Sequence, residues 1–116
     1  MRRIRLAGQL AEPISHYTDG VEAGGFLYVS GMLPLDAHGD LVGAGDVVRQ
    51  AEQVLDNVGD VLRAAGATFN DVVRVGVYLL NVADRPSTRC AGATSAMPGQ
   101  RARWWRSARS PSQTHW

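Results

Sequence analysis

Few side chains in this 116-residue chain have the type and spacing that independent chemistry requires. His16, His38 and His115 are scattered, and no two of them stand at a spacing typical of a metal site. Ser30 could act as a nucleophile beside a histidine, but the G-x-S-x-G turn of hydrolases is absent. The single cysteine, Cys90, lies in STRCAGATS, which offers no base. We therefore expect no metal site and no serine or cysteine nucleophile.

A second kind of chemistry is indicated by the C-terminal stretch RARWWRSARSPSQTHW. Residues 87–116 contain five Arg and no acidic residue, whereas residues 1–86 contain seven Arg and all eleven acidic residues, which gives net charges of +5 and −4. Trp104 and Trp105 could stack on unpaired bases while guanidinium groups contact phosphate, as in single-strand binding. The tail lacks Leu, Ile, Val, Phe and Tyr, however, and this composition predicts a disordered basic tail.

The elements that would position a site begin with a hairpin. Residues 20–31, GVEAGGFLYVSG, predict two short strands around Gly24-Gly25, a dipeptide that permits the positive φ of a tight turn. Residues 32–43, MLPLDAHGDLVG, contain the Pro, Asp and Gly residues of an irregular loop.

A long amphipathic helix should follow, with Asp46 as its N-cap and Gly66 just beyond its end. Its polar face should carry Arg49, Gln50, Glu52, Gln53, Asp56, Asp60 and Arg63. Its apolar face should contain Val47, Val48, Ala51, Val54, Leu55, Val58, Val61, Leu62 and Ala65, at helical spacing.

Residues 71–81, DVVRVGVYLLN, predict a third strand with one face on a core. Val73, Val75, Val77 and Leu79 alternate there with Arg74, Gly76, Tyr78 and Leu80. The order strand, strand, helix, strand indicates an α+β layer with the helix on one face of a sheet, which needs further strands to be complete. The N-terminal stretch is too interrupted for a signal peptide and no stretch is long and apolar enough to span a membrane, so we expect a cytoplasmic protein.

Four motifs occur together between residues 12 and 86: P-I-x-x-Y, V-S-G-x-x-P, Q-x-x-x-x-L-x-N-V and A-A-G-x-x-x-x-D-V-V. In this combination and spacing the chain resembles the RidA (YjgF/YER/UK, L-PSP) family. The resemblance implies a chorismate-mutase-like α+β fold with helices on one face of a mixed sheet. It also implies a homotrimer with pockets between subunits.

The resemblance further implies hydrolysis of reactive 2-imino or 2-enamino acids to 2-oxo acids and ammonia, without metal or cofactor. The substrate would be a small imine, enamine or other small carboxylate. By similarity, Tyr17, Ser30 and Gly31 lie on the substrate-binding side of the pocket, while Met32 stands where many family deaminases have Gln.

The family pattern is interrupted after Pro86. The expected P-x-R-[ST]-x-V-E-V, whose Arg binds the substrate carboxylate, and the final strand with a Glu are absent from residues 87–116. If the reading frame is shifted by one base from Pro86 onward, permitted choices of the degenerate codon bases give a sequence that contains R-P-A-R-T-L-V-E-V. In the shifted frame, the codons of Met97-Pro98 allow only Ala before R-P-A, and those of Trp104-Trp105 allow only Val before E-V. Both residues agree with the family pattern.

We therefore interpret residues 1–86 as an incomplete RidA-like domain and residues 87–116 as a basic Arg/Trp tail, either disordered or derived from a frameshift. The chain is expected to be an imine deaminase that is weak or inactive in this form. The alternative is a non-catalytic RNA- or ligand-binding protein of the same fold that uses the basic tail.

Overall fold

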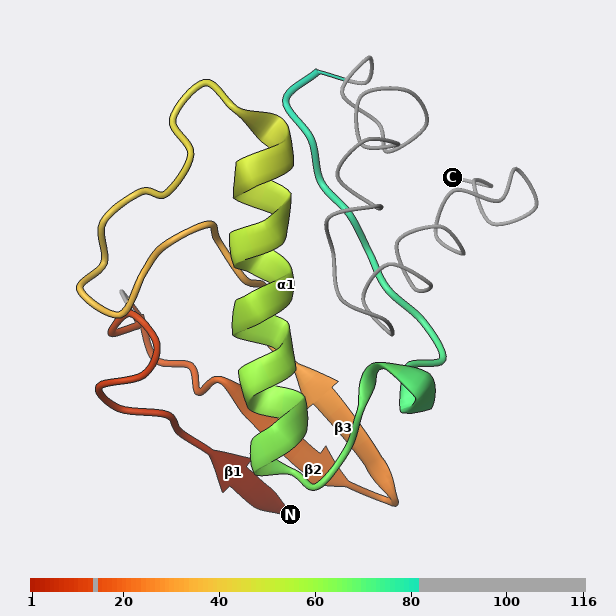
Figure 1. Ribbon diagram of the computed structural model, residues 1–116. Helices are drawn as coiled ribbons and strands as arrows, with labels where there is room; N and C mark the ends of the chain where they lie inside the picture. Colours follow the sequence, from red (N-terminus) through yellow and green to blue (C-terminus); the bar gives the residue numbers. More distant parts are fainter. Residues whose placement is uncertain (14, 82–116) are drawn as a thin grey trace. The chain divides into compact units, whose positions relative to one another are not determined.

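The computed structural model describes residues 1–13 and 15–81, and three short strands and one long helix organise the first part of the chain (Figure 1). The chain divides into a compact unit from Met1 to Thr68 and a second unit that begins at Phe69. The predicted boundary at residue 86 and the tail 87–116 lie outside the described residues.

The sheet of the first unit is antiparallel in the order β1-β2-β3, with β1 at Arg2–Ile4, β2 at Gly20–Ala23 and β3 at Phe26–Val29. β2 and β3 form the predicted hairpin. Gly24 and Gly25, with φ of +58° and +81°, make its two-residue turn, and such values are strained for residues with a side chain. β1 was not predicted, because three residues are too few to show a period.

The helix α1, Val47–Ala64, lies within the predicted bounds. The Asp46 carboxylate accepts hydrogen bonds from the main-chain N–H groups of Val48 and Arg49, as an N-cap does. Gly66 follows the helix with φ of +74°, so both predicted end signals are confirmed.

The helix packs on one face of the sheet. Val61 is fully buried with Ile4 and Leu10, and Leu27 and Val29 of β3 pack against this cluster. At Gly20 an added Cβ would lie 2.9 Å from the Val61 Cγ1 atom, so the close approach of helix and sheet requires glycine there. The α+β fold class predicted from the sequence is confirmed.

The second unit differs from the prediction. A short 3-10 helix, Phe69–Asp71, precedes residues 72–81, which lie in no strand. Val73, Val75 and Leu79, predicted to face a core, are exposed. The predicted strand is therefore wrong in this structure. The physical reason is that a strand obtains its main-chain hydrogen bonds from a neighbouring strand, and the alternation of residues 71–81 does not by itself supply one.

Candidate functional site

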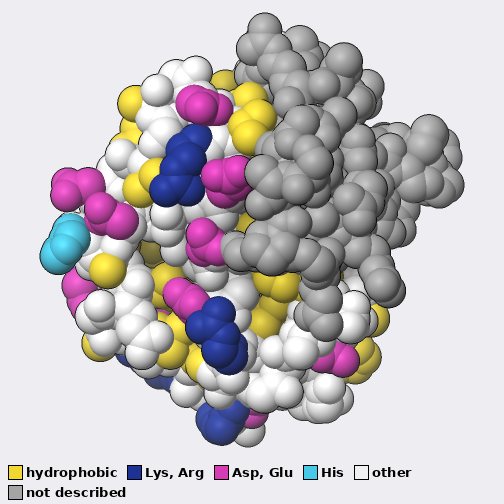
Figure 2. Space-filling view, viewed as in Figure 1, with side chains coloured by type: hydrophobic (Ala, Val, Ile, Leu, Met, Phe, Trp, Pro, Cys, Tyr) yellow, Lys and Arg dark blue, Asp and Glu magenta, His cyan; other side chains and the backbone are white. Residues whose placement is uncertain are grey.

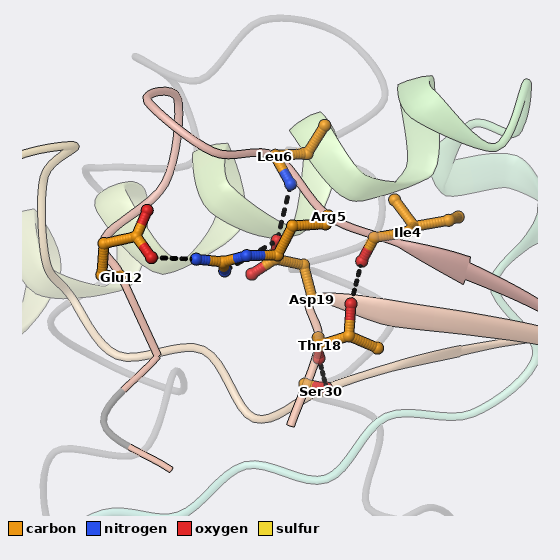
Figure 3. A network of polar contacts seen from close by, with 7 residues as sticks. All are labelled: Ile4, Arg5, Leu6, Glu12, Thr18, Asp19 and Ser30. Carbon is orange, nitrogen blue, oxygen red and sulfur yellow. Dashed lines mark hydrogen bonds and ion pairs between the residues drawn. The ribbon is translucent and has the colours of Figure 1, made fainter. Parts of the chain in front are cut away.

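The candidate site starts where β3 ends, at Ser30 and Gly31. The Ser30 main-chain N–H donates to the Asp19 carbonyl at 3.0 Å, which continues the β2–β3 pairing by one step. The Ser30 hydroxyl donates to the carbonyl of Thr18 (Figure 3). A carbonyl can only accept, so the hydroxyl hydrogen is used within the protein and the lone pairs of the oxygen are left for another donor.

Gly31 has space beside it. A Cβ added there would have no atom within 4 Å, and its φ is not in the positive range. Neither backbone strain nor packing within the described residues therefore requires glycine at this position. Gly31 thus lies at an open surface beside the Ser30 side chain.

Tyr17 is 47% exposed, and its main-chain N–H donates to the Ser15 carbonyl at 2.9 Å. It directly precedes Thr18, the residue to which the Ser30 hydroxyl is bound. The hydrogen bond between Ser30 and Thr18 therefore brings Ser30 close to the backbone beside Tyr17, although Thr18 and Ser30 are twelve positions apart in the sequence. Periodicity in the sequence cannot show such a contact.

The loop after Gly31 is held by the helix. Asn57, 7% exposed, donates its side-chain amide to the carbonyls of Leu33 and Leu35 at 3.1 and 3.0 Å. Gln53 donates to the Asn57 side-chain oxygen at 3.0 Å, which fixes the orientation of the amide. Gln50 donates to the carbonyl of Gly43 at 2.9 Å. Two side chains of the Q-x-x-x-x-L-x-N-V motif therefore fasten both ends of the loop.

Within the loop, the Asp36 carboxylate accepts from the N–H groups of His38 and Asp40 at 2.9 and 3.0 Å. The hydrogen bond from the N–H of Asp40 is the main cause that lowers the pKa of Asp36 below its usual 3.8. Desolvation opposes it, and the N–H of His38 adds a further lowering effect. His38 thus lies in an exposed turn, and the Ser30 hydroxyl is bound to a carbonyl rather than to a histidine.

Asp19 and Asn57 are buried polar residues that the sequence analysis did not single out. Asn57 stands three residues after Val54 and four before Val61, which places it on the apolar face of the helix, and this spacing was a usable signal. Asp19 had no comparable signal, since its partners Arg5 and Leu6 are distant in sequence.

The outer surface of α1 carries acidic and basic side chains close together (Figure 2). Arg63 pairs with Asp60 at 2.8 Å and Arg49 with Glu52 at 3.4 Å. Among the described residues, no group of three or more His, Cys, Asp or Glu could hold a metal ion, and no helix has the length and hydropathy to cross a membrane. Cys90, Trp104, Trp105 and His115 lie outside the described residues.

Comparison with known proteins decides the family. The model of the family described as Endoribonuclease L-PSP matches residues 8–102. The chain belongs to this L-PSP (RidA) family. The match extends the resemblance at both ends of residues 12–86.

Curated L-PSP relatives are similar over most of the chain. A RutC family protein of Pyrococcus horikoshii is 36% identical over 72% of this chain and 67% of its own length. A 2-iminobutanoate/2-iminopropanoate deaminase of Capra hircus is 39% identical over 72% of this chain and 61% of its own length. The 3-aminoacrylate deaminase RutC of Acinetobacter baylyi is 36% identical over 65% and 60%. The aligned part thus spans about three fifths to two thirds of these relatives.

A solved structure agrees with the assignment. The crystal structure of RidA from an Antarctic Psychrobacter matches with a TM-score of 0.65 and 32% sequence identity, over 72% of this chain and 67% of that one. The RidA-like fold expected from the four motifs is therefore confirmed.

Proposed function

We propose that this chain derives from an imine hydrolase of its family, whose complete site acts on reactive 2-imino or 2-enamino acids, and that residues 1–86 carry only part of that site. The observation that carries the proposal is its similarity to proteins named 2-iminobutanoate/2-iminopropanoate deaminase, 39% identical in Capra hircus and 33% in Mus musculus. The polar Ser30 oxygen beside the open surface of Gly31 supports it.

The reaction needs no redox partner. A water oxygen bonds to the carbon of the protonated C=N group, and one water proton moves to nitrogen. The tetrahedral intermediate then collapses to a C=O group as the C–N bond breaks, and the second water proton leaves with the nitrogen as ammonium. The protein has to hold the substrate and orient the water. With its hydrogen donated to Thr18, the Ser30 hydroxyl can accept a hydrogen bond from the iminium N–H or from the attacking water.

Catalysis should be weak in this form, because the Arg and Glu motifs expected after Pro86 are absent from residues 87–116. We attribute their absence to a one-base shift near codon 86. DNA sequencing across codons 80 to 116 tests this origin directly. A frame that does not read P-A-R-T-L-V-E-V would contradict it.

The activity is tested with 2-iminopropanoate made in situ from D-alanine by a D-amino acid oxidase, with pyruvate formation compared to the spontaneous rate. We expect the chain with the restored frame to accelerate hydrolysis and the present chain to stay close to the spontaneous rate. Equal acceleration by both chains would contradict the impairment. Absence of acceleration by either would contradict the imine-hydrolase function itself.

We also propose that copies of the chain associate as a homotrimer through the sheet face opposite α1. Leu27 and Val29 point to the core, so Phe26 and Tyr28 point to the other face, where they are 58% and 61% exposed. Their ring centroids lie 6.4 Å apart, which makes a continuous aromatic surface.

Analytical ultracentrifugation tests this association. Phe26→Ser with Tyr28→Ser should shift the chain from trimer to monomer, because burial of aromatic surface drives association. The control is Leu41→Ser, which removes a 55% exposed apolar side chain from the loop. A monomeric parent chain would overturn the proposal.

The description of the matching family as Endoribonuclease L-PSP favours a second candidate, RNA binding by the basic tail. Lys and Arg contacts to phosphate release counterions, so affinity should fall steeply as salt rises. Binding should be lost when residues 87–116 are deleted. Binding that is independent of salt or of the tail would rule out this candidate.

A further inference from the structure

Asp19 is a buried acid to which the proposed chemistry gives no role. It stands directly before β2, and its side chain is 5% exposed. One carboxylate oxygen, Oδ2, accepts from the main-chain N–H of Leu6 at 2.7 Å and from the Arg5 guanidinium at 3.4 Å (Figure 3). Burial of a carboxylate is costly unless partners compensate for the lost water, and these two partners provide that compensation.

Asp19 and the preceding residue, Thr18, are also bound to the end of β1. The Asp19 N–H donates to the Ile4 carbonyl at 3.1 Å, and the Thr18 hydroxyl donates to the same carbonyl. Together with the Leu6 and Arg5 contacts, four hydrogen bonds fix residues 18 and 19 against residues 4 to 6. Arg5 also pairs with Glu12, which limits the positions that its guanidinium can adopt.

The same two residues hold Ser30. Its main-chain N–H is bound to the Asp19 carbonyl and its hydroxyl to the Thr18 carbonyl. Any displacement of residues 18 and 19 therefore moves both the backbone and the side chain of Ser30. In Figure 3 these contacts form a chain of polar groups from Glu12 and Arg5 through Asp19 and Thr18 to Ser30.

We propose that Asp19 is a positioning residue for Ser30: paired with Arg5 and Leu6, it holds the carbonyls of residues 18 and 19 where they fix the Ser30 backbone and turn its lone pairs outward. The effect on catalysis rests on the proposed imine-hydrolase function. The effect on the geometry of Ser30 does not.

Amide hydrogen exchange measured by NMR on the full chain tests the geometry. Asp19→Asn keeps the size of the side chain. Its amide oxygen, in the place of Oδ2, can still accept from Leu6 and Arg5, but the negative charge and with it the ion pair are lost. Exchange of the Leu6 and Ser30 amides should be accelerated about tenfold, as expected when charge-assisted hydrogen bonds are replaced by neutral ones. The matched control is Glu22→Gln, which breaks the surface pair with Arg2 on the neighbouring strand.

The pattern of exchange separates positioning from general stabilisation. The amide of Leu55 in α1 should keep its parent exchange rate in Asp19→Asn, measured where circular dichroism shows the variant fully folded. Equal acceleration of Leu55 and Ser30, or an unchanged Ser30, would overturn the proposal. If Asp19→Asn does not fold, Arg5→Met removes the ion pair and leaves the Leu6 contact. It should accelerate Ser30 exchange to a smaller extent, and an unchanged Ser30 rate in this variant would equally overturn the proposal.

The restored-frame chain tests the catalytic consequence. Asp19→Asn should lower kcat for 2-iminopropanoate several-fold with little change in KM, and Glu22→Gln should change neither. Parent-like kcat in Asp19→Asn would overturn the catalytic part of the proposal. An inactive parent would contradict the imine-hydrolase function, while the exchange of the Ser30 amide would still decide whether Asp19 positions it.

Discussion

Residues 46–66 and residues 71–81 are both periodic and apolar in sequence, but only the first segment forms regular structure. A helix satisfies most main-chain groups within itself, and here Asp46 and Gly66 complete its ends. An extended segment depends on another strand for the same hydrogen bonds. The residues of the helix are therefore sufficient to specify it, whereas the pattern of residues 71–81 specifies a strand only if a partner strand is present.

Truncation of an apolar side chain should show the difference between the two segments most clearly. Leu55→Ala, at a buried helix position, should lower the free energy of unfolding by about 2–5 kcal/mol, because it leaves a cavity. Leu80→Ala removes the same atoms from a fully exposed position and should change it by less than about 0.5 kcal/mol. Urea denaturation of both variants measures the difference. A large loss in Leu80→Ala would mean that residues 71–81 find a packed environment in solution.

A buried polar contact should give the next largest effect. Asn57→Ala leaves the carbonyls of Leu33 and Leu35 without their donor and should cost about 1–3 kcal/mol of unfolding free energy. The control Asp60→Asn weakens an exposed pair with Arg63 and should cost at most about 1 kcal/mol. Equal losses in the two variants, measured by urea denaturation, would show that Asn57 does not hold the loop.

The helix N-cap tests the local origin of α1. Asp46→Ala removes the acceptor for two main-chain N–H groups and should cost about 1 kcal/mol, while Asp46→Ser should restore most of it. Thermal unfolding followed by circular dichroism is sufficient for this measurement. Identical midpoints for the parent chain and Asp46→Ala would mean that packing rather than the cap determines where the helix begins.

The smallest effect is expected at Asp36, on the surface of the loop. Main-chain N–H groups lower its pKa in the folded chain, so its stabilising effect is present above the usual value of 3.8 and is lost as pH falls through the lower folded value. The stability difference between the parent chain and Asp36→Asn should therefore shrink as the pH is lowered from 6 towards acid. A difference that grows with acid, in urea titrations at several pH values, would contradict the direction of the pKa shift.

Elements with local signals could be predicted from the amino-acid sequence alone. Three features were predictable because each depends on residues close together in the chain. They are the N-cap and apolar spacing of α1, the Gly24-Gly25 turn, and the loop at residues 32–43 with its Pro, Asp and Gly residues. The four motifs also sufficed for the family. Tyr17, Ser30 and Gly31 remain site predictions, for which the structure shows the surroundings.

The remaining features of the fold and of the candidate site depend on the tertiary structure. It paired β1 with β2, brought Arg5 to Asp19 and Thr18 to Ser30, buried Asn57 under the loop, and left residues 72–81 without a strand. These outcomes depend on groups that are distant in the chain or on the presence of a partner. Hydrogen bonds and burial are properties of pairs in space, and no period in the sequence encodes which pair will form.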